Sequence, residues 1–482
     1  MEVQRPHAVC IPYPAQGHIC AMLKLAKLLH HKGFHITYVL TQLNYTHIMK
    51  ARNFLPLTQS PTFRFETIPD GLPSRENPDT ALDVADLCFS TGKNCYAPFM
   101  ELIQRLNSTA SDVPPVSCVV SDTVMPFAVG ATQELGVPVV LFWPLSAVAS
   151  LMHIYSPHLR DKVTKNKDVI SGDYIIDWIP GVESIRLSDI PTTAWSTDPN
   201  DPFIDYIISE VASKSYKASA LIFHTFDELE PQVCKALSSM FHRVYTIGPI
   251  PMLLKGLPES DEIDKIECNL WKEDSTCIQW LDTKNPKSVV YVNFGSLAVT
   301  DPEKLIEFAM GLSKSMQNFL WIIRPELISG DWSTILPPEF MDAVKDRGFI
   351  ANWCDQERVL NHPSVGGFLT HCGWNSMVES MSAGVAMVCW SFFADQPTNR
   401  YCCCSQWRLG LEIENDVKRE NVESVVRELM EGKKGREVKK KALFWKERAE
   451  VATSVGGSSF LNLDKLIGEV LLSGGQHFPN GV

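Results

Sequence analysis

Short apolar runs alternate with helical patterns along this chain, and this alternation is the feature that most restricts its fold. The first run, at residues 7–12, is followed by apolar residues at helical spacing up to Gly33 and by a second run at 36–40. Runs that are apolar throughout are typical of parallel strands buried on both faces. The chain therefore begins with a predicted β-α-β unit, and the same sheet is expected to continue through strands at 116–120, 139–143 and 244–247.

A second alternating series follows an irregular, charged stretch, with predicted strands at 288–296, 319–323, 349–351, 367–370 and 385–390. Strands that alternate with helices predict an α/β fold, here two Rossmann-like parallel-sheet domains facing a central cleft. Ligands of such domains bind at the carboxyl ends of the strands, so the cleft is the expected site. The predicted boundaries are an N-terminal domain at 1–250, a linker at 251–274, a C-terminal domain at 275–455, and a segment at 456–482 that can return to the N-terminal domain.

The charge of the chain argues against a nucleic-acid partner. Its 44 Lys+Arg residues against 56 Asp+Glu residues give a net charge of −12, which would repel a phosphate backbone. No uninterrupted apolar run reaches the roughly 20 residues of a membrane helix, so stable membrane insertion is not expected. The basic run at 433–448 is interrupted by glutamates and is interpreted as a solvated helix face.

The chain has fourteen cysteines, which raises the question of disulfides or a metal site. No secretory leader opens the sequence, so we expect reduced thiols and a cytoplasmic location. Cys402, Cys403 and Cys404 are contiguous, and the other cysteines of this region form no C-x-x-C pair. The spacing therefore predicts no metal site.

The most informative stretch predicts an anion site. A strand at 368–370 is followed by a turn and by a helix from Trp374 to Ala383. His371, Asn375 and Ser376 then gather at the N-terminal end of this helix, where free backbone N–H groups and the helix dipole favour an anion. This is a phosphate site that needs no metal.

Neighbouring residues fit the other parts of a nucleotide sugar. Glu379 lies one turn beyond Asn375 on the same face and can accept hydrogen bonds from two ribose hydroxyls. Trp353 offers an aromatic face for a base, and Asp395 with Gln396 suits sugar hydroxyls. Each residue alone could belong to an ordinary capped β-α-β unit. The set together predicts a site for a nucleotide diphosphate sugar.

The segment 353–396, with its HCGWNS core and closing ADQ, resembles the signature box of plant family 1 UDP-glycosyltransferases. The resemblance extends over almost the whole chain, and within that family it is strongest to the subgroup that glucosylates cyanohydrins, iridoid aglycones, diterpenoids and other terpenoids. Further matching motifs are PYPAQGHI at 12–19, FETIPDGLP at 65–73, HTFDELE at 224–230 and VNFGS at 292–296.

The resemblance implies a GT-B fold whose C-terminal domain holds UDP-glucose and whose N-terminal domain holds the acceptor. It implies that Trp353 stacks on uracil, that the Cys354 backbone bonds the edge of the base, and that Gln356 and Glu379 lie at the ribose. It also implies diphosphate contacts from Ser296, His371, Asn375 and Ser376, and sugar contacts from Trp374, Asp395 and Gln396. No cofactor beyond the donor substrate is implied.

The resemblance also implies a mechanism. His18 follows the first strand, in a loop at the cleft, and a neutral imidazole there can take the proton of an acceptor hydroxyl. Asp122 is implied as the carboxylate that stabilises the resulting imidazolium. The expected reaction is an inverting transfer of glucose from UDP-glucose to a hydroxyl or carboxyl group of a small lipophilic plant metabolite, such as a terpenoid, iridoid, cyanohydrin or phenol. The protein is expected to act as a monomer.

The sequence departs from the family pattern at several positions, of which two bear on the sugar and acceptor sites. Pro144 stands where relatives often carry a threonine that reaches the sugar, and Cys20-Ala21 replaces the usual Asn-Pro.

Two alternative functions remain at this point. One is a nucleotide-sugar binding protein that has lost activity through changes such as Pro144. The other is a nicotinamide or flavin oxidoreductase, which normally needs a G-x-G-x-x-G motif after a strand, and the sequence contains none there.

Overall fold

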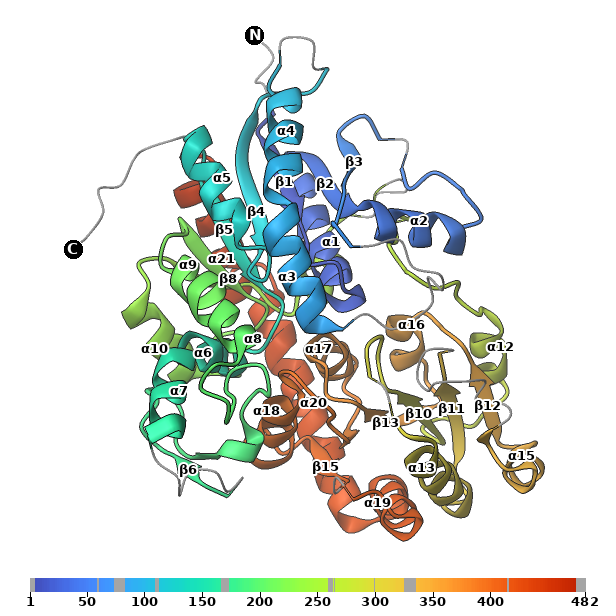
Figure 1. Ribbon diagram of the computed structural model, residues 1–482. Coiled ribbons are helices and arrows are strands. Elements are labelled where there is room, and N and C mark those ends of the chain that lie inside the picture. The colour runs from blue at the N-terminus through green and yellow to red at the C-terminus, as the bar shows by residue number, and fades with distance from the viewer. Residues whose placement is uncertain are drawn as a thin grey trace.

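The computed structural model describes residues 5–58, 60–72, 83–108, 112–165, 173–258, 263, 265–298, 300–324, 335–413 and 416–473. Two parallel sheets, each flanked by helices, lie in two halves of the molecule (Figure 1). Residues of both halves line one cavity between them. The predicted α/β class with two Rossmann-like parallel-sheet domains is confirmed.

The first sheet has seven parallel strands in the order β3-β2-β1-β4-β5-β8-β9. The order reverses between β1 and β4, so the carboxyl ends of these two strands open a crevice. The strands are β1 (His7–Ile11), β2 (His35–Thr41), β3 (Phe63–Ile68), β4 (Val116–Asp122), β5 (Val139–Trp143), β8 (Ala220–Phe223) and β9 (Val244–Thr246).

Helices cover both faces of this sheet, and strands such as β1 and β2 are buried along their whole length. The longest, α1 (Gln16–His31), connects β1 to β2. The others are α2 (Gln42–Ala51), α3 (Val84–Asn94), α4 (Tyr96–Leu106), α5 (Phe127–Leu135), α6 (Ala147–Ile154), α7 (Ser156–Lys165), α8 (Pro202–Tyr206), α9 (Ser213–Ser215), α10 (Pro231–Met240) and α11 (Ile250–Lys255). A short antiparallel pair, β6 (Ile175–Ile176) and β7 (Ile185–Arg186), lies beside them.

The second sheet has six parallel strands in the order β12-β11-β10-β13-β14-β15. Its order reverses between β10 and β13, which places the second crevice at the ends of those strands. The strands are β10 (Val289–Asn293), β11 (Asn318–Ile322), β12 (Gly348–Ala351), β13 (Val365–Thr370), β14 (Met387–Cys389) and β15 (Gly410–Glu412). The helices are α12 (Thr276–Asp282), α13 (Pro302–Lys314), α15 (Pro338–Val344), α16 (Gln356–Leu360), α17 (Trp374–Ala383), α18 (Gln396–Tyr401), α19 (Arg419–Glu431) and α20 (Lys433–Thr453).

The last described helix, α21 (Ser458–Leu466), packs on the N-terminal sheet rather than on the sheet that precedes it in sequence (Figure 1). Ser459 donates to the Gly248 carbonyl, and Asn462 Nδ2 donates to the Thr246 carbonyl at 3.2 Å. These contacts tie the end of the chain to β9. Among the described helices, none is long and apolar enough to cross a membrane.

The irregular, charged stretch expected at 251–274 begins within a helix instead. Helix α11 starts at Ile250, after Pro249 and with Pro251 in its first turn, where proline is favoured because the first backbone N–H groups need no helical partner. Ile250 and Leu253 are buried in the core on that side. Local proline chemistry and two apolar residues therefore extend ordered structure past the predicted boundary.

Candidate active site

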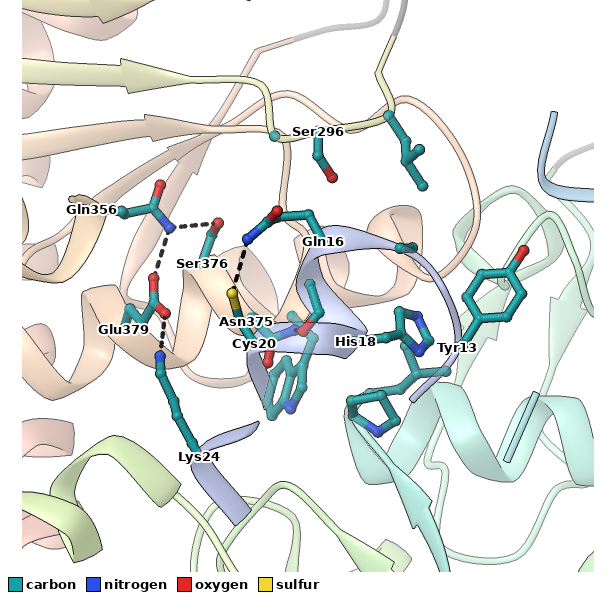
Figure 2. A pocket seen from close by; sticks show the side chains of 18 of the residues that line it. Tyr13, Gln16, His18, Cys20, Lys24, Ser296, Gln356, Asn375, Ser376 and Glu379 are labelled. Carbon is teal, nitrogen blue, oxygen red and sulfur yellow. Dashed lines mark hydrogen bonds and ion pairs between the residues drawn. The ribbon is translucent and has the colours of Figure 1, made fainter. Parts of the chain in front are cut away.

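His18 and Asp122 meet at the carboxyl edge of the first sheet. Asp122 ends β4 and is fully buried, and its Oδ2 lies 2.7 Å from His18 Nδ1. Its Oδ1 accepts from the Val124 backbone N–H at 3.0 Å, which fixes the carboxylate. Because a carboxylate can only accept, Nδ1 carries the proton and Nε2 is left as the basic nitrogen. His18 lines the cavity, so Nε2 is placed to take a proton there (Figure 2).

The prediction that His18 lies in a loop was wrong. It is the third residue of α1, in the first helical turn. The helix begins directly after the Pro14-Ala15 corner, and its first turn carries the imidazole toward the cleft. Burial lowers the pKa of His18, but the charge and hydrogen bond of Asp122 and the charge of Asp395 outweigh this effect and raise the pKa above its usual value.

The N-terminus of α17 opens into the same cavity. Gly373 at its N-cap offers no side chain to bond the first backbone N–H groups, which leaves a site for an anion. Asn375 Nδ2 donates to the Gly17 carbonyl of α1 at 2.9 Å, so this helix end is held directly against the first helix of the other sheet. The predicted phosphate position therefore lies next to His18 in space.

His371 is enclosed by two glycines. A Cβ at Gly295 would lie 2.4 Å from His371 Nε2, and one at Gly373 would lie 2.3 Å from the same atom. Gly295 also has φ of 74°, a conformation that favours glycine. Burial lowers the pKa of His371 to about 4, so the imidazole is neutral and can donate a hydrogen bond to an anion without adding charge. Ser296 follows Gly295 on the cavity wall.

Gln356, Ser376 and Glu379 form one hydrogen-bonded group at the predicted ribose position (Figure 2). Gln356 Nε2 donates to Ser376 Oγ and to Glu379 Oε2, both at 2.8 Å. Its Oε1 accepts from Asn293 Nδ2 at 2.9 Å. Gln356 thus orients the Glu379 carboxylate, and Asn293 at the end of β10 anchors Gln356.

Lys24 of α1 reaches across the cleft to this group, a contact that the sequence did not indicate. Its Nζ lies 2.8 Å from Glu379 Oε1 and also pairs with Glu357. Burial lowers the pKa of Lys24, but the two carboxylates raise it by more and keep the ammonium charged. The sequence does hold one pattern that could have indicated this contact. Gln16, Cys20 and Lys24 are spaced four residues apart, which places their polar groups along one line of a largely buried helix.

The two ends of the cavity differ in character. At one end the Trp353 ring lies 4.8 Å from the Trp271 ring, so the aromatic face predicted for the base is backed by a second indole. Cys354 follows and is buried. At the other end Asp395 and Gln396 begin α18. Asp395 Oδ2 accepts from Asn399 Nδ2 at 2.7 Å, and burial raises the pKa of Asp395 to about 6.

Two side chains predicted to face the sugar have part of their bonding capacity committed. Gln396 Oε1 accepts hydrogen bonds from the backbone N–H groups of Phe392 and Phe393. The side-chain amide nitrogen of Gln396 is therefore the group that can donate to a ligand. Trp374 Nε1 donates to the His224 carbonyl at 2.8 Å. Only the ring of Trp374 can therefore contact a ligand, and its N–H serves the contact between the two halves.

A cavity of about 800 Å³ brings the predicted residues together. Asp122 alone among them does not line it, because it lies behind His18. The wall contains His18, Ser296, Trp353, Cys354, Gln356, His371, Trp374, Asn375, Ser376, Glu379, Asp395 and Gln396.

The cysteines show a grouping that spacing did not indicate. All fourteen are free, and the sulfurs of Cys389, Cys403 and Cys404 lie within 4.8 Å of one another. Cys389 ends β14, while the other two lie in the π-helical turn after α18, so tertiary folding joins them. Burial raises the pKa of Cys403, which keeps its thiol protonated.

Residues 9–443 match the model of the UDP-glucoronosyl and UDP-glucosyl transferase family. The chain belongs to this family. It is 53% identical to a 7-deoxyloganetin glucosyltransferase of Catharanthus roseus, over 98% of both chains. It is 47% identical to an (R)-mandelonitrile beta-glucosyltransferase of Prunus dulcis, again over 98% of both.

The fold agrees with that assignment. Phytolacca americana UGT2, solved with UDP-2fluoro-glucose and pterostilbene, superposes with a TM-score of 0.78 at 26% identity, over 96% of this chain and 99% of the other. The protein is a GT-B glycosyltransferase that takes its sugar from a UDP donor. The oxidoreductase alternative is therefore wrong, and the resemblance inferred from the signature box is confirmed.

Proposed function

We propose that this glycosyltransferase moves glucose from UDP-glucose to a hydroxyl of a small lipophilic plant metabolite, of the terpenoid, iridoid, cyanohydrin or phenol class. The observation that carries the proposal is that His18, paired with Asp122 behind it, and the N-terminus of α17 line one cavity. Apolar side chains line the part of the cavity beyond His18, among them Val84, Val124 and Leu145. An apolar wall next to a single base suits a lipophilic alcohol. The named activities of the two relatives above, on 7-deoxyloganetin and (R)-mandelonitrile, support this class.

The proposed reaction is one displacement with inversion. The acceptor oxygen forms a bond to the anomeric carbon while its proton passes to His18 Nε2. Asp122, bonded to Nδ1, stabilises the imidazolium that forms. The bond between the anomeric carbon and the β-phosphate oxygen breaks at the same time, and UDP leaves with its new charge stabilised by the N–H groups of α17. An α-linked donor thus gives a β-glucoside.

In this proposal the two halves of the molecule bind different substrates. Residues 1–250 bind the acceptor and supply the base, residues 275–455 bind the donor, and 251–274 connect them. Asp395 and Gln396 hold the sugar hydroxyls, and Glu379, oriented by Gln356, accepts from the ribose. Pro144 lines the cavity but has no hydroxyl to offer, so recognition of the sugar rests on the C-terminal side.

The test is a UDP-release assay with UDP-glucose against a panel of lipophilic alcohols, phenols, cyanohydrins, iridoid and diterpenoid aglycones and carboxylic acids, with mass spectrometry of the products. A gain of one hexose supports the proposal. Saturable binding of UDP-glucose without product on any acceptor would instead support a nucleotide-sugar binding protein. Substitution of UDP-galactose and UDP-glucuronic acid in parallel reactions establishes the donor preference.

We further propose that the protein acts as a monomer in the cytoplasm. One chain supplies the whole cavity described above, so catalysis needs no second copy. Light scattering at working concentration and fractionation of plant cells test the two statements separately. A dimer that loses activity on dilution would contradict the first.

A further inference from the structure

The acceptor side of the cavity carries a hydrogen-bonded pair, His153 and Thr193, on a largely apolar wall. His153 of α6 and Thr193 line this side together with apolar side chains such as Phe203, Ile207 and Val211. His153 Nε2 lies 2.8 Å from Thr193 Oγ1. Neither residue takes part in the reaction described above. A polar pair in such a position indicates a role in binding, because the few polar groups on an apolar pocket wall usually fix the orientation of a ligand.

The direction of the hydrogen bond between them follows from their neighbours. His153 Nδ1 lies 2.8 Å from the Ala149 carbonyl oxygen, which can only accept, so Nδ1 carries the proton. Burial lowers the pKa of His153 to about 4, so the ring is neutral and Nε2 has a lone pair. Thr193 must therefore donate its hydroxyl proton to Nε2. What Thr193 Oγ1 presents to the cavity is lone pairs alone.

Two other polar side chains on this wall offer no spare acceptor. The Trp143 Nε1–H has no partner among the described residues, but an indole N–H can only donate. Tyr13, beside His18, donates its hydroxyl to the Val84 carbonyl at 3.1 Å and accepts from Cys88 Sγ at 3.4 Å. Its phenol is therefore committed to the protein. Thr193 Oγ1 remains as a group with spare accepting capacity on the described acceptor wall.

Thr193 is held in place from the donor side of the cleft. The preceding Thr192 donates its backbone N–H to the Ala394 carbonyl at 2.9 Å, and its Oγ1 accepts from the Ala394 N–H at 2.8 Å. Ala394 directly precedes Asp395, at the sugar end of the cavity. Asp189, a few residues earlier in the same loop, forms a buried ion pair with Arg400 of α18. The Thr193 hydroxyl is thus fixed relative to the sugar site.

We propose that Thr193 Oγ1, oriented by His153, is a second polar subsite that accepts a hydrogen bond from a hydroxyl or N–H group of the acceptor other than the hydroxyl that reacts. This inference rests on the proposed function and narrows its substrate class to aglycones with two donor groups. One hydroxyl lies at His18 and loses its proton, while the other donates to Thr193. Regioselectivity follows, because the separation of the two groups decides which hydroxyl reaches His18.

The experiment compares α,ω-alkanediols of increasing length with their monomethyl ethers, which keep the distal oxygen but lose its proton. A symmetric diol offers two equivalent hydroxyls, so its kcat/KM, its rate and its association constant are divided by two before each comparison with the ether. For a chain length that spans both sites, the corrected kcat/KM for the diol should exceed that for the ether by about fivefold, the value of one hydrogen bond. Thr193→Val should bring this ratio close to one, and Thr193→Ser, which keeps the hydroxyl, should preserve it. Thr197→Val is the matched control, because Thr197 is exposed and does not line the cavity, and its ratio should equal that of the wild type.

His153→Phe tests the direction of the bond. Without His153 Nε2 the Thr193 hydroxyl is free to donate as well as accept. The kcat/KM for the ethers should therefore rise, and the ratio of kcat/KM between diol and ether should fall. If both variants retain the wild-type ratio, or if the wild type shows no preference at any length, the subsite does not exist.

Binding of the same diols and ethers to the UDP-loaded protein, measured by calorimetry, separates this inference from the proposed function. A diol preference in binding that Thr193→Val removes supports the subsite even if no glucose is transferred. Transfer to diols and ethers at equal rates, with equal binding, overturns the subsite and leaves the glucosyltransferase intact.

Discussion

Lys24 of the N-terminal half and Glu379 of the C-terminal half form an ion pair across the cleft, with Nζ 2.8 Å from Oε1. Glu379 is the residue proposed to accept from the ribose, and its second oxygen is held by Gln356. The carboxylate is therefore positioned by one group from each half of the molecule (Figure 2). Donor binding and the approach of the two halves are thus physically connected.

We expect Lys24→Met to weaken UDP binding by about tenfold, since an uncompensated buried carboxylate is left behind. Burial raises the pKa of Glu379 and Lys24 opposes this, so loss of the lysine raises that pKa further. The carboxylate form exists only above the pKa, and the affinity of the variant should therefore fall more steeply than that of the wild type as pH decreases. Calorimetric titration with UDP across a pH series measures this. Lys32→Met is the control, because Lys32 directly follows the same helix but pairs with Asp464 at the surface.

His18→Ala should reduce kcat/KM by a factor of about 10² to 10⁴, the usual contribution of a general base, and should leave UDP affinity nearly unchanged. Glu379→Ala should show the opposite pattern, with weakened UDP binding. Steady-state kinetics and UDP titration of both variants provide the comparison. Equal loss of donor affinity in the two variants would contradict the assigned roles.

Asp122→Asn should lower activity and move its pH dependence. The raised pKa of His18 places the acidic limb of kcat/KM in the wild type above the usual histidine value, since the base works only when neutral. Removal of the Asp122 charge lowers that pKa, so the acidic limb should move to lower pH while the maximum falls. The asparagine amide can also donate to Nδ1 and favour the wrong tautomer. A pH profile whose limb does not move would show that Asp122 does not set the protonation of His18.

Gly295→Ala should abolish most UDP binding, because its Cβ would overlap the His371 ring at 2.4 Å and displace it from the phosphate position. Gly136→Ala is a matched control. Gly136 also has positive φ, 66°, but a Cβ there would meet nothing within 4 Å. Its variant should lose about 1 kcal/mol of stability from backbone strain and keep its UDP affinity. UDP titration and thermal unfolding of both variants separate the local clash from the strain.

Much of the fold could be read from the sequence because its signals are local. The β1-α1-β2 unit follows from apolar runs and helical spacing, and α17 spans Trp374–Ala383 as predicted from its turn and the Gly384 cap. The apolar strands also predicted parallel sheets. Apart from Ser296, the donor-side residues were found together because they lie within a single stretch of the chain, 353–396.

Other features could not be predicted because their partners are distant in sequence. His18 and Asp122 are 104 residues apart, and resemblance rather than spacing suggested the pair. Lys24 and Glu379 are 355 residues apart and belong to different sheets. His153 and Thr193 belong to no motif quoted above, and the role proposed for them depends on the cavity that they line.

Local sequence patterns were enough to predict most strands of the two sheets, their parallel arrangement and the chemistry of the donor side, because neighbouring residues set helix periods, caps and turns. The tertiary structure alone decided which polar groups of one half meet those of the other. Those contacts arise when the two halves of the molecule pack together, as α1 does on α17, and their energies depend on burial and on distances of a few ångströms that no local pattern encodes.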